Sequence, residues 1–240
     1  MLDFGFYNMD CNDALQDFPD DFFDLAIVDP PYGIKVFSKD NASRSKLAAS
    51  KNYKTYAGGD ISAPDPEYFR QLKRISKNQI IFGANHFIDS IVEGFGGAAS
   101  SCWIVWDKEN GQNDFADCEL ALTSFTTAVR IFRFRWAGML QGNMKEKEIR
   151  IHPTQKPVAL YNWIFANYTK RGQKIIDTHV GSASSLIAAH ENGLKFVGFE
   201  LDPDYYKQAA ARYERETAQI SLFDLLDQEK KGESNNVIHY

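Results

Sequence analysis

The chain has 240 residues, 44% of them hydrophobic and 25% charged, which are values typical of one large globular domain. The formal net charge of −5 argues against a protein that coats nucleic acid through bulk charge, so any such contact must be local. No apolar run of 18 residues, secretory leader, CxxC pair or HExxH pattern occurs, so we expect a cytoplasmic protein without a membrane span, disulfide or zinc site.

Two short strands near the N-terminus each end in an acidic residue. Residues 4–9 predict a strand that turns at Asp10 and Cys11 into a short helix. Residues 25–28 predict a buried parallel strand, which the prolines of Asp29-Pro30-Pro31-Tyr32 terminate. Since the carboxyl ends of strands in an open α/β sheet line the ligand crevice, a carboxylate, a stiff carbonyl and an aromatic ring are expected there. An ordinary Asp-Pro-Pro turn is the alternative interpretation.

The chemistry of residues 29–32 suits methylation of an exocyclic amine. Such an amine is a poor nucleophile, and two acceptors aimed at its N–H hydrogens, the Asp29 carboxylate and the Pro30 carbonyl, favour its reactive geometry. Tyr32 can stack on the base. With Pro31 these residues form a motif that resembles the DPPY amino-methyltransferases, which transfer a methyl group from S-adenosyl-methionine to an exocyclic amine in DNA.

Residues 35–62 lack apolar periodicity and are rich in Ser, Lys, Asn and Gly. A loop of this length in a compact domain is usually functional or disordered. We interpret it as a flap that closes over DNA, with Lys35, Lys46 and Lys51 as DNA contacts. A solvated surface run is the alternative.

The middle of the chain predicts the rest of the sheet. A helix is expected over 64–76, a strand over 79–83 and a short helix over 86–92. Strands over 102–106 and 118–125 are separated by a turn-rich stretch and are expected to pair antiparallel. The expected fold is an α/β, doubly wound, Rossmann-like methyltransferase sheet with an antiparallel edge hairpin, as the resemblance also implies.

Basic and aromatic residues alternate over 130–136. In an extended segment Arg133 and Arg135 lie on one face, and the aromatic residues lie on the other. With Arg130, the arginines are candidate phosphate contacts, and the aromatic face can pack or stack on bases. Residues 130–150 stand where the resembled family has its target-recognition segment. A solvated surface run is again the alternative.

The sequence His152-Pro153-Thr154-Gln155-Lys156-Pro157 precedes an amphipathic helix expected over 158–168. Thr154 and Pro157 suit a helix start on local grounds alone. The resemblance implies that Thr154, Gln155 and Lys156 lie near the methionine part of the cofactor.

A βαβ unit follows, with strands over 174–177 and 195–200 and a turn of small residues between the first strand and its helix. Gly181 lets a cofactor approach the backbone, and Glu200 can accept hydrogen bonds from both ribose hydroxyls. The family's usual turn is closer to DPFxGSGT, from which Thr178, His179 and Ala183 depart. A Rossmann-like turn without a methyl donor is the alternative. The expected S-adenosyl-methionine site comprises Asp10, Cys11, Asp29, Thr154, Gln155, Lys156, Asp177, His179, Gly181, Ser182, Ser184, Glu200 and Leu201.

The order of these parts, with the catalytic loop first and the cofactor turn last, is that of the β group of the resembled family. We therefore expect residues 1–217 to form a methyltransferase domain that acts on adenine N6 in double-stranded DNA, as in restriction-modification systems. Adenine is favoured because Asp opens the motif. Cytosine N4 and a methylation-inactive DNA-binding module of the same fold are the alternatives.

Residues 218–240 are expected to form a flexible tail after a helix that ends near Thr217. Gln219, Leu222 and Phe223 resemble the short peptides by which DNA enzymes dock on the sliding clamp. Packing of this apolar pair back onto the domain is an equally good interpretation.

Overall fold

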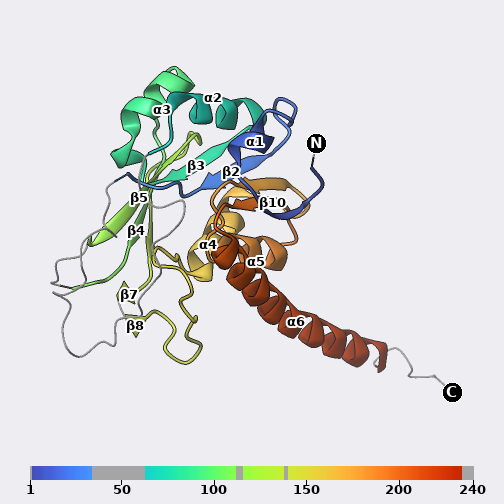
Figure 1. Cartoon of the computed structure of the whole chain (residues 1–240). Coiled ribbons are helices and arrows are strands. Elements are labelled where there is room, and N and C mark those ends of the chain that lie inside the picture. The colour runs from blue at the N-terminus through green and yellow to red at the C-terminus, as the bar shows by residue number, and fades with distance from the viewer. Residues whose placement is uncertain (1, 34–62, 112–115, 138–139, 234–240) are drawn as a thin grey trace.

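The computed structural model describes residues 2–33, 63–111, 116–137 and 140–233, with the backbone alone for 219–233. Its centre is an eight-stranded sheet of order β1-β10-β9-β2-β3-β5-β4-β6 (Figure 1). The first five of these strands are parallel, and β5 runs antiparallel to both of its neighbours. The strands are β1 (Gly5–Asn8), β2 (Leu25–Val28), β3 (Gln79–Phe82), β4 (Trp103–Asp107), β5 (Cys118–Thr123), β6 (Arg130–Arg133), β9 (Lys174–Asp177) and β10 (Lys195–Glu200).

Helices cover both faces of the sheet (Figure 1). One face carries α1 (Asn12–Leu15), α2 (Pro66–Ile75), η3 (Ala84–His86) and α3 (Ile88–Phe95), and the other carries α4 (Val158–Tyr168), α5 (Ser184–Glu191) and α6 (Pro203–Glu233). Successive residues of β2 serve opposite cores: Leu25 and Ile27 pack with α4 and α5, whereas Ala26 and Val28 pack with α1 and α2. A strand buried on both faces is continuously apolar, and the predicted doubly wound fold is confirmed.

The two crossovers diverge at the border between β9 and β2. The connection through α2 leads from β2 to β3, and the connection through α5 leads in the opposite direction from β9 to β10. A crevice for ligands forms at such a switch point, at the carboxyl ends of the strands. Asp29, Asp177 and Glu200 all stand at these ends.

The antiparallel pairing of β4 with β5 is confirmed, with Trp103 opposite Leu122. However, the pair is not at the edge of the sheet, because β6 adds to β4 in parallel beyond it. Residues 130–136 are also not one strand. After β6 the chain leaves the sheet, and β7 (Trp136–Ala137) pairs with β8 (Leu140–Gln141) in a separate two-stranded sheet. The Trp136 indole explains the departure, since it is buried and donates to the carbonyl of Gln155 at 2.8 Å.

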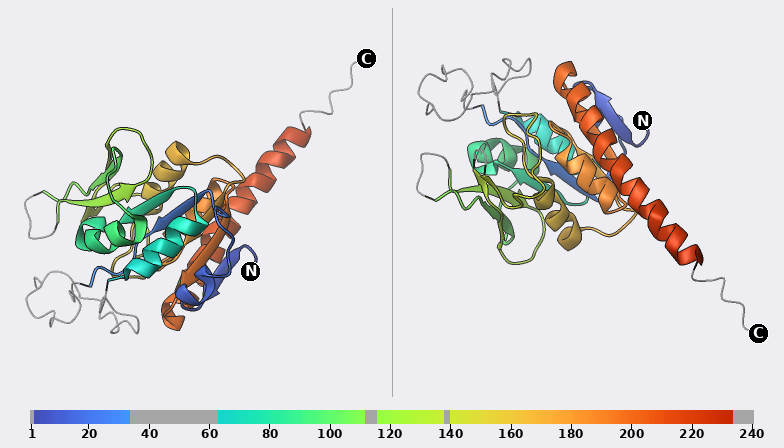
Figure 2. Two further views of the ribbon diagram at one scale, coloured as in Figure 1. Left: turned by 90° about the horizontal axis from the view of Figure 1, so that it is seen from above. Right: turned by 90° about the horizontal axis from the view of Figure 1, so that it is seen from below.

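The helix α6 is longer than predicted. It continues to Glu233, and Figure 2 shows its C-terminal half projecting from the rest of the molecule. The prediction of a flexible tail from residue 218 is therefore wrong for most of that segment. Residues 218–231 contain no Pro or Gly and many strong helix formers, so the helix has no local reason to end. Gln219, Leu222 and Phe223 lie within this helix, and their role in clamp binding stays a prediction.

Two further observations bear on the predictions. Lys35, Lys46 and Lys51, the flap residues, lie outside the described residues. Within the described part of the chain, no helix combines the length and apolar character that crossing a membrane requires.

Candidate active site

The catalytic loop begins where β2 ends, and a hydrogen bond within it joins its two functional side chains. The hydroxyl of Tyr32 donates to Oδ1 of Asp29 at 2.9 Å. The Tyr32 ring stacks on His86 with centroids 4.7 Å apart and planes at 16°. It also packs on Gly83, where φ is +66° and an added Cβ would lie 2.1 Å from the ring. Glycine is required there, and Tyr32 is held against the end of β3.

A buried lysine lies at the centre of the site. The Lys156 ammonium forms ion pairs with Oδ2 of Asp29 and, at 3.0 Å, with Oε2 of Glu119 on β5. Lys108 pairs with the other oxygen of Glu119 at 2.5 Å. Two carboxylates and two ammonium groups therefore alternate in one chain of contacts that begins at Tyr32. Sequence reasoning missed Glu119 and Lys108, because nothing local distinguishes them from ordinary surface charges.

The ion pairs set the protonation of this cluster. Burial raises the pKa of Asp29, and the Lys156 ammonium opposes that rise. Burial alone would lower the pKa of Lys156, but Asp29 and Glu119 raise it above the ordinary value. Burial is likewise outweighed at Glu119, whose pKa Lys156 and Lys108 lower to about 2. Lys156 is thus a permanent cation that favours the ionised form of Asp29.

Lys156 also joins the catalytic loop to the turn of the βαβ unit. Its backbone carbonyl accepts a hydrogen bond from the Ser184 hydroxyl at 2.7 Å, while its side chain reaches Asp29. The neighbouring Gln155 is buried, and its side chain accepts from the backbone N–H of Ile151 at 2.9 Å. Thr154 is exposed and contacts His152 at 3.0 Å. Of the three predicted cofactor-side residues, Lys156 therefore lies deepest in the site.

The turn before α5 is shaped by the backbone conformation of Gly181 and by its hydrogen bond to Glu200. Gly181 has φ of +57°, and its N–H donates to Oε2 of Glu200 at 3.0 Å. The other Glu200 oxygen accepts from the backbone N–H of Asp202 at 2.9 Å. The His152 ring packs beside Gly181, 3.7 Å from the place of an added Cβ, and was not among the predicted site residues. The predicted pairing of a glycine turn with an acid at the end of β10 is present.

Ala183 adopts a left-handed conformation that glycine prefers. Its φ is +67°, which costs an L-residue about 1–2 kcal/mol. The residue is fully buried and belongs to the hydrophobic cluster under α4 and α5. Its methyl group therefore adds to the core, which offsets part of the backbone strain.

Asp177 is buried at the end of β9, and His179 beside it is half-buried. Asp177 accepts from the His179 backbone N–H at 2.9 Å and from the Ser185 hydroxyl at 2.5 Å. Burial, with smaller contributions from Asp29 and Glu200, raises the pKa of Asp177 to about 7. Burial lowers the pKa of His179 to about 4, so its imidazole is neutral near pH 7.

The raised pKa of Asp177 makes a prediction about stability. A carboxyl group whose pKa is higher in the folded state stabilises at low pH, and that contribution is lost as pH rises from its ordinary pKa towards 7. Asp177→Asn does not titrate, so the stability of the variant relative to wild type should increase by about 1.4 kcal/mol per pH unit between pH 5 and 7. Thermal unfolding of the ligand-free protein at pH 5, 6, 7 and 8 measures this. A stability difference independent of pH would contradict it, and Asp13→Asn on the exposed side of α1 is the matched control.

The remaining predicted residues lie at the ends of β1 and β10 and at the start of α5. Oδ1 of Asp10 accepts from the Asn12 backbone N–H at 2.9 Å, which is the local contact expected at a helix start. Cys11 is buried, and burial raises the pKa of its thiol to about 12. Leu201 is an exposed apolar residue, and its carbonyl accepts from the Asn8 side chain at 3.1 Å. Ser182 and Ser184 are buried beside one another, with 3.1 Å between their hydroxyl oxygens.

Comparison with known proteins shows which family the C-terminal part of the chain resembles. Residues 132–211 match the family model described as DNA methylase, of the N6/N4 methyltransferase type. Over these residues the chain is similar to the DNA amino-methyltransferases of the adenine-N6/cytosine-N4 type. The Type II methyltransferase M2.DpnII of Streptococcus pneumoniae is 38% identical over 81 residues, which are 34% of this chain and 30% of that protein. M.HpaI of Haemophilus parainfluenzae is 24% identical over 93% of this chain and 77% of its own length.

Solved structures of DNA methyltransferases share the fold of this chain. The complex of M1.HpyAVI with S-adenosyl-methionine aligns with a TM-score of 0.54 and 20% identity, over 86% of this chain and 98% of that one. The cytosine-N4-specific PvuII DNA methyltransferase aligns with a TM-score of 0.58 and 14% identity, over 91% of both chains. At these identities the likeness establishes the fold and leaves the target base open.

Proposed function

We propose that this protein is an S-adenosyl-methionine-dependent DNA methyltransferase that methylates N6 of adenine in double-stranded DNA. The observation that carries this proposal is the position of Lys156. Its side chain contacts Asp29 of the catalytic loop, and its backbone contacts Ser184 of the cofactor turn. One residue thus holds together the two halves that a methyl transfer needs.

The residues around the turn suit S-adenosyl-methionine. Gly181 brings the backbone close to the crevice, and the Glu200 carboxylate at the end of β10, which accepts from the Gly181 N–H, is an acceptor suited to ribose hydroxyls. The carboxylates of Asp10 and Glu200 favour a ligand with positive charge. When bound, the cofactor supplies an electrophilic methyl group. Titration calorimetry with S-adenosyl-methionine separates this proposal from a methylation-inactive DNA-binding module, for which no binding at millimolar cofactor is expected.

Asp29 and Pro30 hold the target amine in its reactive geometry. Among the described residues, Tyr32 donates to Oδ1 of Asp29 and Lys156 pairs with Oδ2, and a carboxylate oxygen can accept a second hydrogen bond. Asp29 therefore accepts from one N–H of the amine without losing its supports, and the Pro30 carbonyl accepts from the other. Tyr32 has one ring face covered by His86, so an extruded base stacks on the opposite face or takes the place of His86.

Adenine is proposed over cytosine because Asp opens the motif at residue 29. Digestion of methylated DNA to nucleosides, followed by mass spectrometry, distinguishes N6-methyladenine from N4-methylcytosine. The second product would keep the mechanism and change the target base.

The arginines of the 130–136 segment suit a surface that meets DNA phosphates. Arg130, Arg133 and Arg135 are exposed at the edge of the sheet, and Phe132, on the face of β6 opposite Arg133, packs on Trp163 with centroids 5.5 Å apart. Arg133 is 62% exposed and forms a 3.4 Å ion pair with Asp107. Such a pair is weak and leaves the guanidinium available to phosphate.

Neutralising Arg133 and Arg135 together should weaken DNA binding and reduce the slope of log K against log salt by about two, because each phosphate contact releases condensed counterion. Fluorescence anisotropy at several salt concentrations measures the slope. Lys170→Gln with Arg171→Gln removes the same charge from an exposed loop at the amino end of β9, away from the crevice, and should leave the slope unchanged. An unchanged slope in the Arg133 and Arg135 variant would place these arginines off the DNA.

A further inference from the structure

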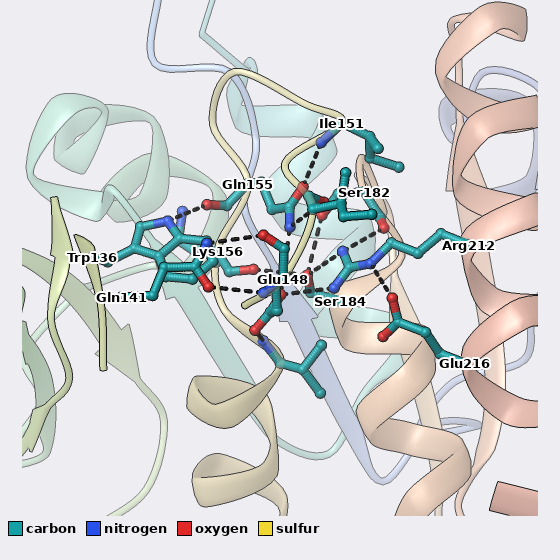
Figure 3. A network of polar contacts seen from close by, with 12 residues as sticks. Trp136, Gln141, Glu148, Ile151, Gln155, Lys156, Ser182, Ser184, Arg212 and Glu216 are labelled. Carbon is teal, nitrogen blue, oxygen red and sulfur yellow. Dashed lines mark hydrogen bonds and ion pairs between the residues drawn. The ribbon is translucent and has the colours of Figure 1, made fainter. Parts of the chain in front are cut away.

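A buried arginine of α6 reaches into the cofactor turn. The side chain of Arg212 is only 1% exposed, yet it lies on a helix remote in sequence from the site. Its Nη1 donates to the Ser182 carbonyl at 2.9 Å and to the Ser184 hydroxyl at 3.0 Å. Figure 3 shows this guanidinium at the junction of the turn, the helix and a third segment. Arg212 therefore fixes both the backbone and a side chain of the turn.

The third segment contributes one of two carboxylates that pair with Arg212, the other being Glu216 on α6, whose Oε1 lies 3.1 Å from Nε. Glu148 follows the β7–β8 hairpin, and its Oε2 accepts from Nη2 of Arg212 at 2.7 Å. Its Oε1 accepts from the backbone N–H of Val158 at the start of α4, at 2.9 Å. Glu148 is 17% exposed, although it stands in a run of exposed charges. Glu148 therefore makes contacts within the protein, whereas the charged residues 145–147 before it face solvent.

The backbone of Glu148 is held as firmly as its side chain. The Gln141 side chain donates to the Glu148 carbonyl at 2.9 Å and accepts from its N–H at 2.8 Å (Figure 3). Gln141 belongs to β8, so the hairpin that follows the arginine segment is tied to Glu148. Between β8 and α4 the chain has no regular secondary structure, and these contacts determine its position.

We propose that Glu148 and Arg212 are positioning residues that couple residues 141–151 to the cofactor turn, so that an occupied cofactor site strengthens DNA binding. The inference rests on the proposed function. The physical reason is that both ends of the link are held by buried, charge-assisted bonds, and a buried ion pair that loses one partner leaves an uncompensated charge. A conformation of the cofactor turn that binds the cofactor therefore also stabilises one arrangement of residues 141–151. By linkage, DNA strengthens cofactor binding by the same factor.

The test compares DNA affinity with and without S-adenosyl-homocysteine. Fluorescence anisotropy gives the Kd for a DNA duplex in wild type, Glu148→Gln and Arg215→Gln. Arg215 lies one turn from Arg212 on the same helix, pairs with Glu216 and is 55% exposed, so it is the matched control. Wild type and Arg215→Gln should bind DNA at least about fivefold more tightly with the cofactor product, the lower range of allosteric coupling. Glu148→Gln should retain less than about half of that factor.

Several outcomes would overturn the coupling. One is a wild-type protein that binds both ligands without mutual tightening, and another is a Glu148→Gln variant with the full wild-type ratio. If Glu148→Gln does not fold, Gln141→Ala replaces it, since it removes two bonds to the Glu148 backbone and leaves Arg212 paired. A full wild-type ratio in Gln141→Ala overturns the coupling too. Failure of wild type to bind S-adenosyl-homocysteine would contradict the proposed function instead.

Discussion

Asp29→Ala should lower the rate of methyl transfer by about 10²–10³-fold, the usual cost of removing one preorganised acceptor. The affinity for S-adenosyl-methionine should change little, because the turn contacts of Gly181 and Glu200 remain. Single-turnover kinetics with labelled cofactor measure the rate, and calorimetry measures the affinity.

Asp29→Asn is the informative comparison for this prediction. It keeps the shape and one acceptor oxygen but loses the charge that pairs with Lys156. We expect a rate between that of wild type and that of Asp29→Ala. Retention of more than about a tenth of wild-type turnover by Asp29→Ala, well above the expected range, would assign the acceptor role elsewhere.

Lys156→Met should have the second-largest effect, and its signature is a shift in pH dependence. Burial raises the pKa of Asp29, and Lys156 opposes the rise. Without the ammonium the pKa of Asp29 rises further, because the adjacent positive charge that favours the carboxylate is gone. Because the ionised carboxylate is the acceptor, the acid limb of the pH–rate profile should move to higher pH, and raising the pH should restore part of the activity.

Lys174→Met provides the control for this shift. Lys174 lies over the Phe22 ring at the amino end of β9. Asp177 and the crevice are at the opposite end of this strand. Replacing Lys174 should leave the acid limb in place. An acid limb in Lys156→Met at the wild-type pH, with a uniformly lower rate, would mean that Lys156 acts through packing and not through the charge of Asp29.

The sequence predicted those features that local signals encode. The apolar run of β2 followed by two prolines placed Asp29 at the carboxyl end of a buried strand. Small residues between β9 and α5 likewise revealed the turn at Gly181, and the alternation over 130–136 separated arginines from aromatics. These patterns reflect steric limits of the backbone and the period of a strand, so they can be interpreted from neighbours in sequence.

The partners of Asp29 and of the cofactor turn could not be predicted in this way. Glu119 reaches Lys156 because β5 pairs with β3, a long-range choice with no local signal. Arg212 resembles any basic residue on an exposed helix until its neighbours from residues 148 and 182 are in place. The length of α6 was underestimated for a different reason. The apolar pair after Thr217 resembles a docking motif, but helix propensity continues through it, and α6 extends past the predicted end.

The most direct test of the central claim is transfer of labelled methyl groups from S-adenosyl-methionine to duplex DNA by the purified protein, followed by analysis of the methylated nucleoside. We predict label in N6-methyladenine with wild type, and label reduced by about 10²–10³-fold with Asp29→Ala. Wild-type protein that binds both cofactor and DNA but leaves every nucleoside unlabelled, across a pool of random sequences, would contradict the assignment of the Asp29 and Lys156 site to methyl transfer.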